Sequence, residues 1–166
     1  LVSLIFAGIL IIIAGVSPLK SFYELFIGAF GSTNSLAETL SRATPLILTG
    51  LAAGIAFKAK FWNIGAEGQL YFGALGATFF GTGLIEFPSL IMIPFLFIVG
   101  MISGGLLLLP LVILKNIYKV DEVVTTLLLN FVVILLVSFL LDGPWKDPMS
   151  LGWPQGAPII DQGVLP

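Results

Sequence analysis

The residues best suited to chemistry form one polar run in an otherwise apolar sequence. Asn63, Glu67 and Gln69 lie within seven consecutive residues, and Gly65 and Gly68 separate them. Their amide and carboxylate groups are the kind that hydrogen-bond a polar, uncharged solute, and we expect the two amides to share hydrogen bonds with the carboxylate. The glycines predict a broken helix or a re-entrant turn, which a membrane tolerates only where protein or water covers the backbone.

Glu67 and Asn130 are polar residues within apolar blocks, and each has two interpretations. A carboxylate in a membrane segment is costly, so Glu67 either lines a path or pairs with Lys58 or Lys60 at the inner interface. An Asn deep in an apolar block needs an interhelical partner, so Asn130 either joins two helices or lines the same path. The residues predicted for the solute path are Asn63, Gly65, Glu67, Gly68, Gln69 and Asn130.

Composition restricts any other chemistry. The 166-residue chain has no Cys and no His, which removes disulfides, thiolate chemistry and the commonest general base and metal ligand. No Gly-x-x-x-x-Gly-Lys-Ser/Thr motif occurs, so we expect no nucleotide binding through a P-loop. The sequence therefore predicts no catalytic residue, no metal site and no cofactor.

The balance of charged and apolar residues indicates that lipid is the main solvent of the chain. Charged residues make up 10% of the sequence and hydrophobic residues 58%, whereas about 25% of an ordinary soluble domain is charged. A soluble domain of this size could not cover so much apolar surface. The same composition excludes a disordered chain, a coiled coil and a nucleic-acid-binding protein.

Apolar blocks predict an all-α, polytopic membrane helix bundle with about five membrane segments. The third segment is the one predicted to be broken, and Pro94 and Pro110 are expected to bend the fourth. The first segment lacks the basic region and cleavage site of a signal peptide, and we interpret it as the end of a membrane helix whose beginning is missing. The five blocks cover residues 1–16, 44–57, 62–85, 89–114 and 123–141.

Two further helical features precede the second block. Aromatic and aliphatic residues at near-helical spacing predict a short helix in the membrane interface at residues 22–30. Residues 35–42 are typical of a capped helix start, with Ser35 three residues before Glu38. That start would lengthen the 14-residue second block enough to span a membrane, and it places Arg42 four residues after Glu38 in the favourable order.

Basic residues predict the orientation of the segments. Lys58, Lys60, Lys115 and Lys119 are placed in the cytoplasm, and the three remaining basic residues fall outside. The charged turn at residues 115–122 is predicted to be a solvated loop, with a docking surface for a cytosolic partner as the alternative.

Glycines predict where helices approach one another. Gly50 and Gly54 stand four residues apart, as do Gly100 and Gly104, and Gly73 lies in the third block. Small residues at this spacing let two backbones come close. The alternative is that glycine is simply common in membrane helices.

Residues 61–69, with the sequence FWNIGAEGQ, resemble the permease subunits of bacterial ABC importers of the simple-sugar and nucleoside type. Those proteins belong to the superfamily of branched-chain amino acid and ribose-like permeases and carry a near-identical F-N-I-G-x-E-G-Q run, from which Trp62 departs. Residues 38–51, 122–130 and 143–148 resemble the same branch.

The resemblance implies a fragment of a longer protein. Residues 1–141 would form the transmembrane region, as its N-terminal half, and residues 142–166 a truncated extracytoplasmic loop. It implies a non-catalytic, multi-pass protein of the bacterial plasma membrane that works with cytosolic ABC ATPase subunits, a second permease subunit and an extracytoplasmic solute-binding lipoprotein. An ion-coupled secondary transporter that uses Glu67, and a static membrane anchor, are the alternatives.

Overall fold

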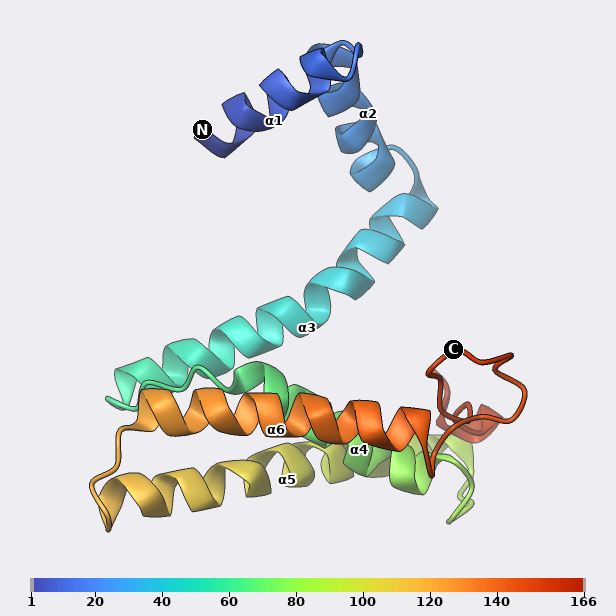
Figure 1. Cartoon of the computed structure of the whole chain (residues 1–166). Helices are drawn as coiled ribbons and strands as arrows, with labels where there is room; N and C mark the ends of the chain where they lie inside the picture. Colours follow the sequence, from blue (N-terminus) through green and yellow to red (C-terminus); the bar gives the residue numbers. More distant parts are fainter. Residues whose placement is uncertain (1, 166) are drawn as a thin grey trace. The chain divides into compact units, whose positions relative to one another are not determined.

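The computed structural model describes residues 2–165, which form six α-helices, one 3₁₀ helix and no β-strand (Figure 1). Leu1 and Pro166, the outermost residues of the first apolar block and of the terminal loop, lie outside the described residues. This architecture confirms the predicted all-α fold. The helices are α1 (Val2–Ile13), α2 (Pro18–Phe30), α3 (Thr33–Lys58), α4 (Ala66–Gly81), α5 (Ser89–Asn116), α6 (Glu122–Asp142) and the 3₁₀ helix η1 (Asp161–Gly163).

The chain divides into two compact units, Leu1–Leu48 and Thr49–Pro166, and the division falls inside α3. In the first unit, α1 and α2 meet at a bend of 115°. Pro18 opens α2, a position where its missing N–H costs nothing. The Thr39 hydroxyl ties the early part of α3 to α2 by donating to the Ala29 carbonyl at 2.9 Å. Helix α2 covers the predicted interfacial helix at residues 22–30, and its place in a membrane stays a prediction.

The start of α3 differs from the predicted one by three residues. Ser32, not Ser35, provides the cap: its hydroxyl oxygen accepts the backbone N–H of Ser35 at 3.0 Å. Ser35 therefore lies within the first turn, where it bonds the Ser32 hydroxyl at 2.8 Å. The turn residues 31–32 end α2 and leave the helix free to begin earlier. The predicted lengthening is confirmed, since α3 runs for 26 residues.

Among residues 2–165, three helices are long and apolar enough to cross a membrane, namely α3, α5 and α6. The pair α1 and α2 passes the same test only when taken together as one bent element. Helix α4 has 16 residues, about 24 Å at 1.5 Å per residue, which is less than the hydrocarbon thickness of about 30 Å. The third predicted segment is thus a short helix preceded by non-helical chain. Helix α5 continues without interruption through Pro94 and Pro110.

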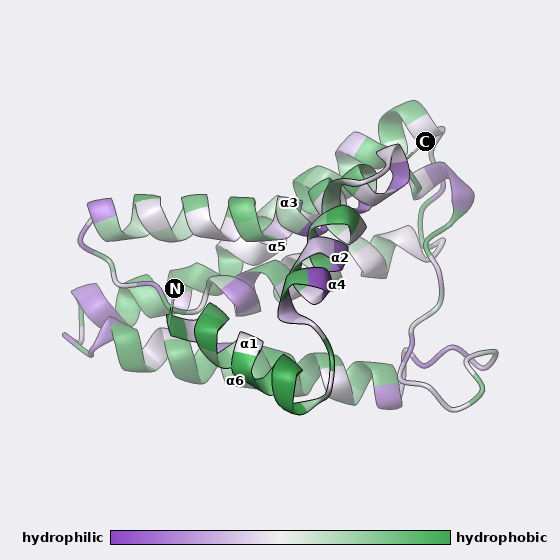
Figure 2. Cartoon of the chain, turned by 90° about the horizontal axis from the view of Figure 1, so that it is seen from above, coloured by the Kyte–Doolittle hydropathy of each residue, from purple (hydrophilic) through white to green (hydrophobic). Residues whose placement is uncertain are grey.

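In the second unit, α4 packs against both α5 and α6. The buried apolar side chains belong to α5 and α6: Met92, Leu96, Leu111 and Val133. Most other apolar side chains of these helices are exposed, as expected for surfaces that meet lipid or other helices, and Figure 2 shows hydrophobic residues along the helices with hydrophilic residues gathered near their ends.

Glycines make the contact between α4 and α5 close. A Cβ atom on Gly73 would lie 2.7 Å from the Gly100 carbonyl oxygen, and one on Gly104 would lie 2.8 Å from the Gln69 carbonyl oxygen. Gly50 and Gly54 behave differently, because a Cβ on either would meet nothing within 4 Å. Within residues 2–165 the contact predicted for that pair is not made, and it stays a prediction for a helix outside this chain.

The stretch after α6 is a folded loop, as predicted. Lys146 and Gly156 form an isolated antiparallel bridge. The Ile160 N–H donates to the Gly81 carbonyl at the end of α4, at 2.9 Å, and η1 packs on α5. The loop is therefore attached to the C-terminal end of α4 and packs against α5.

Candidate functional site

The predicted polar run forms the break between α3 and α4. Residues 61–65 are non-helical, and α4 begins at Ala66. Asn63 is 4% exposed, and its Oδ1 accepts the Gly65 N–H at 3.0 Å. This local side-chain bond is an Asx turn, and it sets the direction in which α4 starts. The first helical bond follows at once, from the Gln69 N–H to the Gly65 carbonyl at 3.1 Å.

Helix α6 holds the break in place. The Ile64 N–H donates to the Thr126 hydroxyl at 3.2 Å, and that hydroxyl donates in turn to the Val123 carbonyl at 3.2 Å. Thr126 is fully buried. A covered backbone N–H needs a hydrogen-bond partner, and for Ile64 a side chain 62 residues away in sequence provides it.

The two glycines of the run serve close approach, not a turn. Gly65 has φ −90°, a value that any residue adopts. A Cβ on Gly65 would lie 2.7 Å from the Thr126 carbonyl oxygen, and one on Gly68 would lie 2.8 Å from Asn130 Oδ1. The front of the third predicted segment is non-helical up to Gly65, whereas Gly68 lies inside α4. The reason given for the glycines was wrong, since both are small because α6 lies against them.

Glu67 reaches α6 as well. Asn130 Nδ2 donates to Glu67 Oε2 at 3.3 Å, so Asn130 has the interhelical partner that its depth requires. Asn130 is 8% exposed, while Glu67 remains exposed. The ion pair proposed between Glu67 and Lys58 or Lys60 does not form in the described part of the chain. Asn130 lies eight residues into α6, about 12 Å from its start.

The amides of the run pair with each other. Asn63 Nδ2 donates to Gln69 Oε1 at 3.3 Å, so the expectation that both share hydrogen bonds with Glu67 was wrong. Two buried atoms, Gln69 Nε2 and Asn130 Oδ1, have no hydrogen-bond partner among residues 2–165. The site therefore keeps one unused donor and one unused acceptor.

The end of the bundle beside this site is closed by a charged contact. Lys115 Nζ donates to the Lys60 carbonyl at 2.5 Å and to Glu122 Oε1 at 2.7 Å, and it lies 5.0 Å from the centre of the Phe61 ring. Both charged side chains of this pair are mostly covered. The prediction of a solvated loop was therefore wrong for Lys115 and Glu122, which link the ends of α5 and α6 to the chain before α4.

Two contacts at this site were missed from sequence, and each left a signal. Thr126 lies one turn before Asn130, so the two share a face of α6. Lys115 and Glu122 flank one turn with opposite charges. Neither signal identifies a partner more than 50 residues away, and that is what the fold supplies.

The arrangement brings together groups that can form hydrogen bonds. It offers one exposed carboxylate, three amides and a buried hydroxyl, and no group of three or more His, Cys, Asp or Glu residues lies together within the described residues. Amides and a single carboxylate can hydrogen-bond a neutral polar solute.

Comparison with known proteins gives one family. Residues 35–165 match the family described as "Branched-chain amino acid transport system / permease component". No solved structure matches the chain.

Three curated relatives are similar over most of the chain. A glucose ABC transporter permease protein of Haloferax volcanii is 35% identical over the whole chain, which covers 43% of that relative. A nucleoside ABC transporter permease protein of Lactococcus lactis is 36% identical over 81% of the chain and 37% of its own length. A guanosine ABC transporter permease protein of Bacillus subtilis is 34% identical over 85% of the chain and 40% of its own length. The chain thus spans less than half the length of these relatives.

Proposed function

This chain belongs to the family of permease components of branched-chain amino acid transport systems, and on that premise we propose that it forms part of the translocation path of an ATP-driven importer. The proposed solutes are nucleosides or simple sugars, because the similar permeases are named for glucose, nucleosides and guanosine. The chain itself would do no covalent chemistry.

One observation carries the proposal: a polar, non-helical segment before α4 that hydrogen bonds hold against α6, a helix long and apolar enough to cross a membrane. Burying the Asn63 and Asn130 side chains is costly, and a static anchor has no use for it. Thr126 and the small size of Gly65 support the break specifically. Broken helices at membrane depth are typical of transport proteins, where they surround the solute or ion path.

The residues proposed for this path are the six of the break and its α6 contact. Asn130 and Glu67 would present an amide and a carboxylate, and Gln69 and Asn130 each keep an unpaired polar atom. Gly65 and Gly68 let α4 lie close enough to α6 for these groups to meet.

The proposed energy source and partners follow from the similarity to ABC transporter permeases. No P-loop motif occurs in the chain, so ATP hydrolysis is assigned to cytosolic ATPase subunits. A second permease subunit would complete the path, and an extracytoplasmic solute-binding lipoprotein would deliver the solute. Residues 1–141 would belong to the transmembrane region and residues 142–166 to the outer surface.

Reconstituted transport tests this proposal. The full-length permease is placed in vesicles with and without its ATPase subunits, and uptake of labelled guanosine and glucose is measured with ATP or with an imposed proton or sodium gradient. We expect uptake of one solute only with ATPase and ATP. Uptake by the permease alone, driven by an ion gradient, would show instead a secondary transporter with Glu67 as the coupling carboxylate.

A further inference from the structure

A pocket of about 440 Å³ lies between α4, α6 and the folded loop, at the opposite end of α4 from the charged contact of Lys115. Its volume falls within the range of small-molecule sites. Side chains with aromatic rings or polar groups line it together with aliphatic ones; those used below are Tyr71, Thr78, Phe79, Thr82, Trp145 and Lys146.

The pocket continues the face of α4 that carries Glu67. Tyr71, Thr78 and Thr82 follow Glu67 at 4, 11 and 15 residues, which a helix of 3.6 residues per turn places on one side. On α6, Val137 and Leu141 line the pocket and follow Asn130 at 7 and 11 residues, again on one side. The pocket lining and the Glu67–Asn130 contact therefore share one side of α4 and one side of α6.

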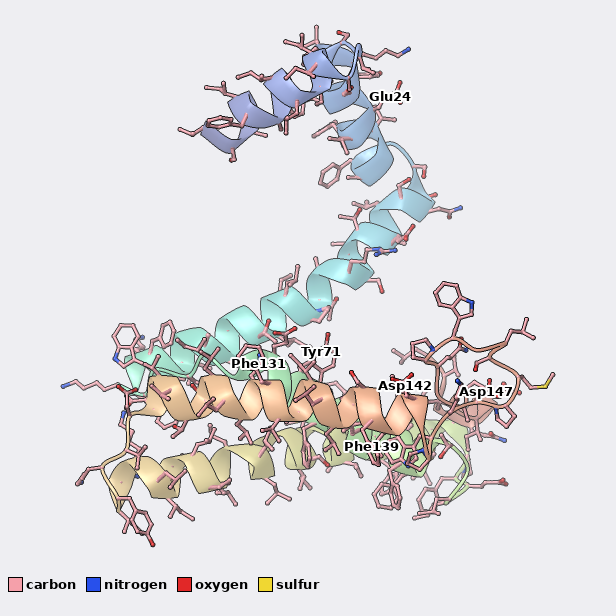
Figure 3. The ribbon with its side chains drawn as sticks, viewed as in Figure 1. Glu24, Tyr71, Phe131, Phe139, Asp142 and Asp147 are labelled. Carbon is pink, nitrogen blue, oxygen red and sulfur yellow. The ribbon has the colours of Figure 1, made fainter. Side chains whose placement is uncertain are left out.

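The loop after α6 lines one side of the pocket, and backbone hydrogen bonds hold it in place. The Trp145 N–H donates to the Leu140 carbonyl at 2.8 Å, and the Asp147 N–H donates to the Gln155 carbonyl at 2.8 Å. Gly156 lies beside Leu141, where a Cβ would approach its side chain to 3.3 Å. Figure 3 labels Tyr71 along the middle of the helices and Asp142 and Asp147 where the loop begins.

The lining combines aromatic faces with unused hydroxyl groups. Trp145 stacks on Phe79 with ring centres 6.1 Å apart and planes 26° apart. Within the described chain the hydroxyls of Tyr71 and Thr78 make no hydrogen bond, although both border the pocket. Lys146 is the single charged lining residue, so no carboxylate is present to attract a cation.

We propose that this pocket binds the ring of a neutral, hydroxyl-bearing solute, a nucleoside or a sugar, on its way to Glu67 and Asn130. Trp145 and Phe79 would contact the ring face of the solute, since aromatic side chains stack on nucleobases of every kind. Tyr71 and Thr78 would hydrogen-bond the solute's hydroxyl edge. The inference rests on the proposed function, because it names the entry site of the same path.

Protection of a cysteine tests the site directly. In the full-length permease assembled with its partners, with cysteines outside this chain replaced by serine, the Thr78→Cys variant is labelled with a small maleimide in the presence of guanosine, glucose or neither. We expect saturating guanosine or glucose to slow labelling about fivefold or more. The Trp153→Cys variant is the matched control, since Trp153 lies on the same loop outside the pocket lining and is 74% exposed.

The proposed contact of Trp145 with the solute predicts how far its removal weakens binding. Trp145→Ala should raise the solute concentration for half-protection of the Thr78→Cys variant about tenfold, and Trp145→Phe should restore most of the loss. Trp153→Ala should leave that concentration unchanged. A structural role of Trp145 alone would instead lower the amount of folded protein and leave half-protection where it was, which would overturn the inference.

The remaining outcomes separate this inference from the proposed function. ATP-dependent uptake without protection by either solute overturns the pocket and keeps the importer. A Thr78→Cys variant that is never labelled shows that another segment fills the pocket, which also overturns it. Protection without ATP-dependent uptake keeps the pocket and overturns the importer.

Discussion

Helix α3 keeps its carboxylate on its own surface, whereas α4 extends its carboxylate to a neighbouring helix. Glu38 Oε1 accepts Arg42 Nη2 at 2.8 Å within α3, and the two side chains are 65% and 79% exposed. Glu67 accepts Asn130 of α6, a residue that is nearly buried. Surface ion pairs contribute little to stability, whereas an amide left without its partner in a covered site is costly.

The same contrast holds for the glycines of the two helices. Gly50 and Gly54 of α3 face open space, whereas Gly68 and Gly73 of α4 face Asn130 and the Gly100 backbone. No residue of α3 is buried. Glycines four residues apart and a carboxylate on a helix therefore do not make a contact by themselves. They make one only where another helix presents groups of matching size and polarity.

The largest difference in stability is expected between two glycine-to-alanine variants, one in α4 and one in α3. Gly73→Ala places a Cβ 2.7 Å from a backbone oxygen that cannot move aside, and it should destabilise the full-length permease by about 3 kcal/mol. Gly54→Ala removes a poor helix former at an open position and should be neutral or stabilising by up to about 1 kcal/mol. Midpoints of thermal unfolding in detergent compare the two.

An equal loss for both alanine variants would break this comparison. It would show that Gly54 meets a close partner in the assembled permease, as the predicted small-residue contact requires.

The next largest difference is expected between variants of Glu67 and of Glu38. Glu67→Ala leaves the Asn130 amide unpaired, at about 1–3 kcal/mol, and should lower both membrane abundance and uptake. Glu67→Gln keeps an acceptor and should retain most of both. Glu38→Ala loses an exposed pair worth at most about 0.5 kcal/mol and should change neither.

Uptake and membrane abundance, measured side by side, decide the role of Glu67. Loss of transport in Glu67→Gln at normal abundance would point to proton coupling. Full activity in both Glu67 variants would mean that its bond to Asn130 is incidental.

Two adjacent threonines give a smaller and sharper test of how α4 begins. Thr126→Val leaves the Ile64 N–H without its acceptor and should cost about 1 kcal/mol. Within residues 2–165 the Thr125 hydroxyl donates only to the carbonyls of Asp121 and Glu122, at the start of its own helix, so Thr125→Val should have little effect. Proteolysis near residues 61–65 and the unfolding midpoint measure the difference; equal behaviour would show that α6 does not hold the break.

The smallest perturbation tests the orientation of the segments in the membrane. Lys119→Cys and Trp153→Cys should leave stability unchanged. In intact cells an impermeant maleimide should label the Trp153 variant and not the Lys119 variant. Labelling at position 119 would reverse the predicted topology.

Much of the fold could be predicted because it depends on short stretches of sequence. The bounds of α5 and α6 follow from uninterrupted apolar blocks that only lipid can solvate. The start of α3 was missed by three residues because Ser32 and Ser35 both suit a cap, and local chemistry does not choose between them. The partners of Glu67, Asn63 and Lys115 were missed for a different reason, since each depends on residues distant in sequence or on packing.

The sequence by itself determined the solvent, the helical class, the polar break and the family, because composition, periodicity and motif spacing act locally along the chain. The tertiary structure decided what the polar residues and glycines contact. Ile64 and Thr126 are 62 residues apart, and Asn130 and Glu67 are 63 apart. Contacts over such separations depend on which helix faces pack together, and packing is set by the shape of both surfaces at once.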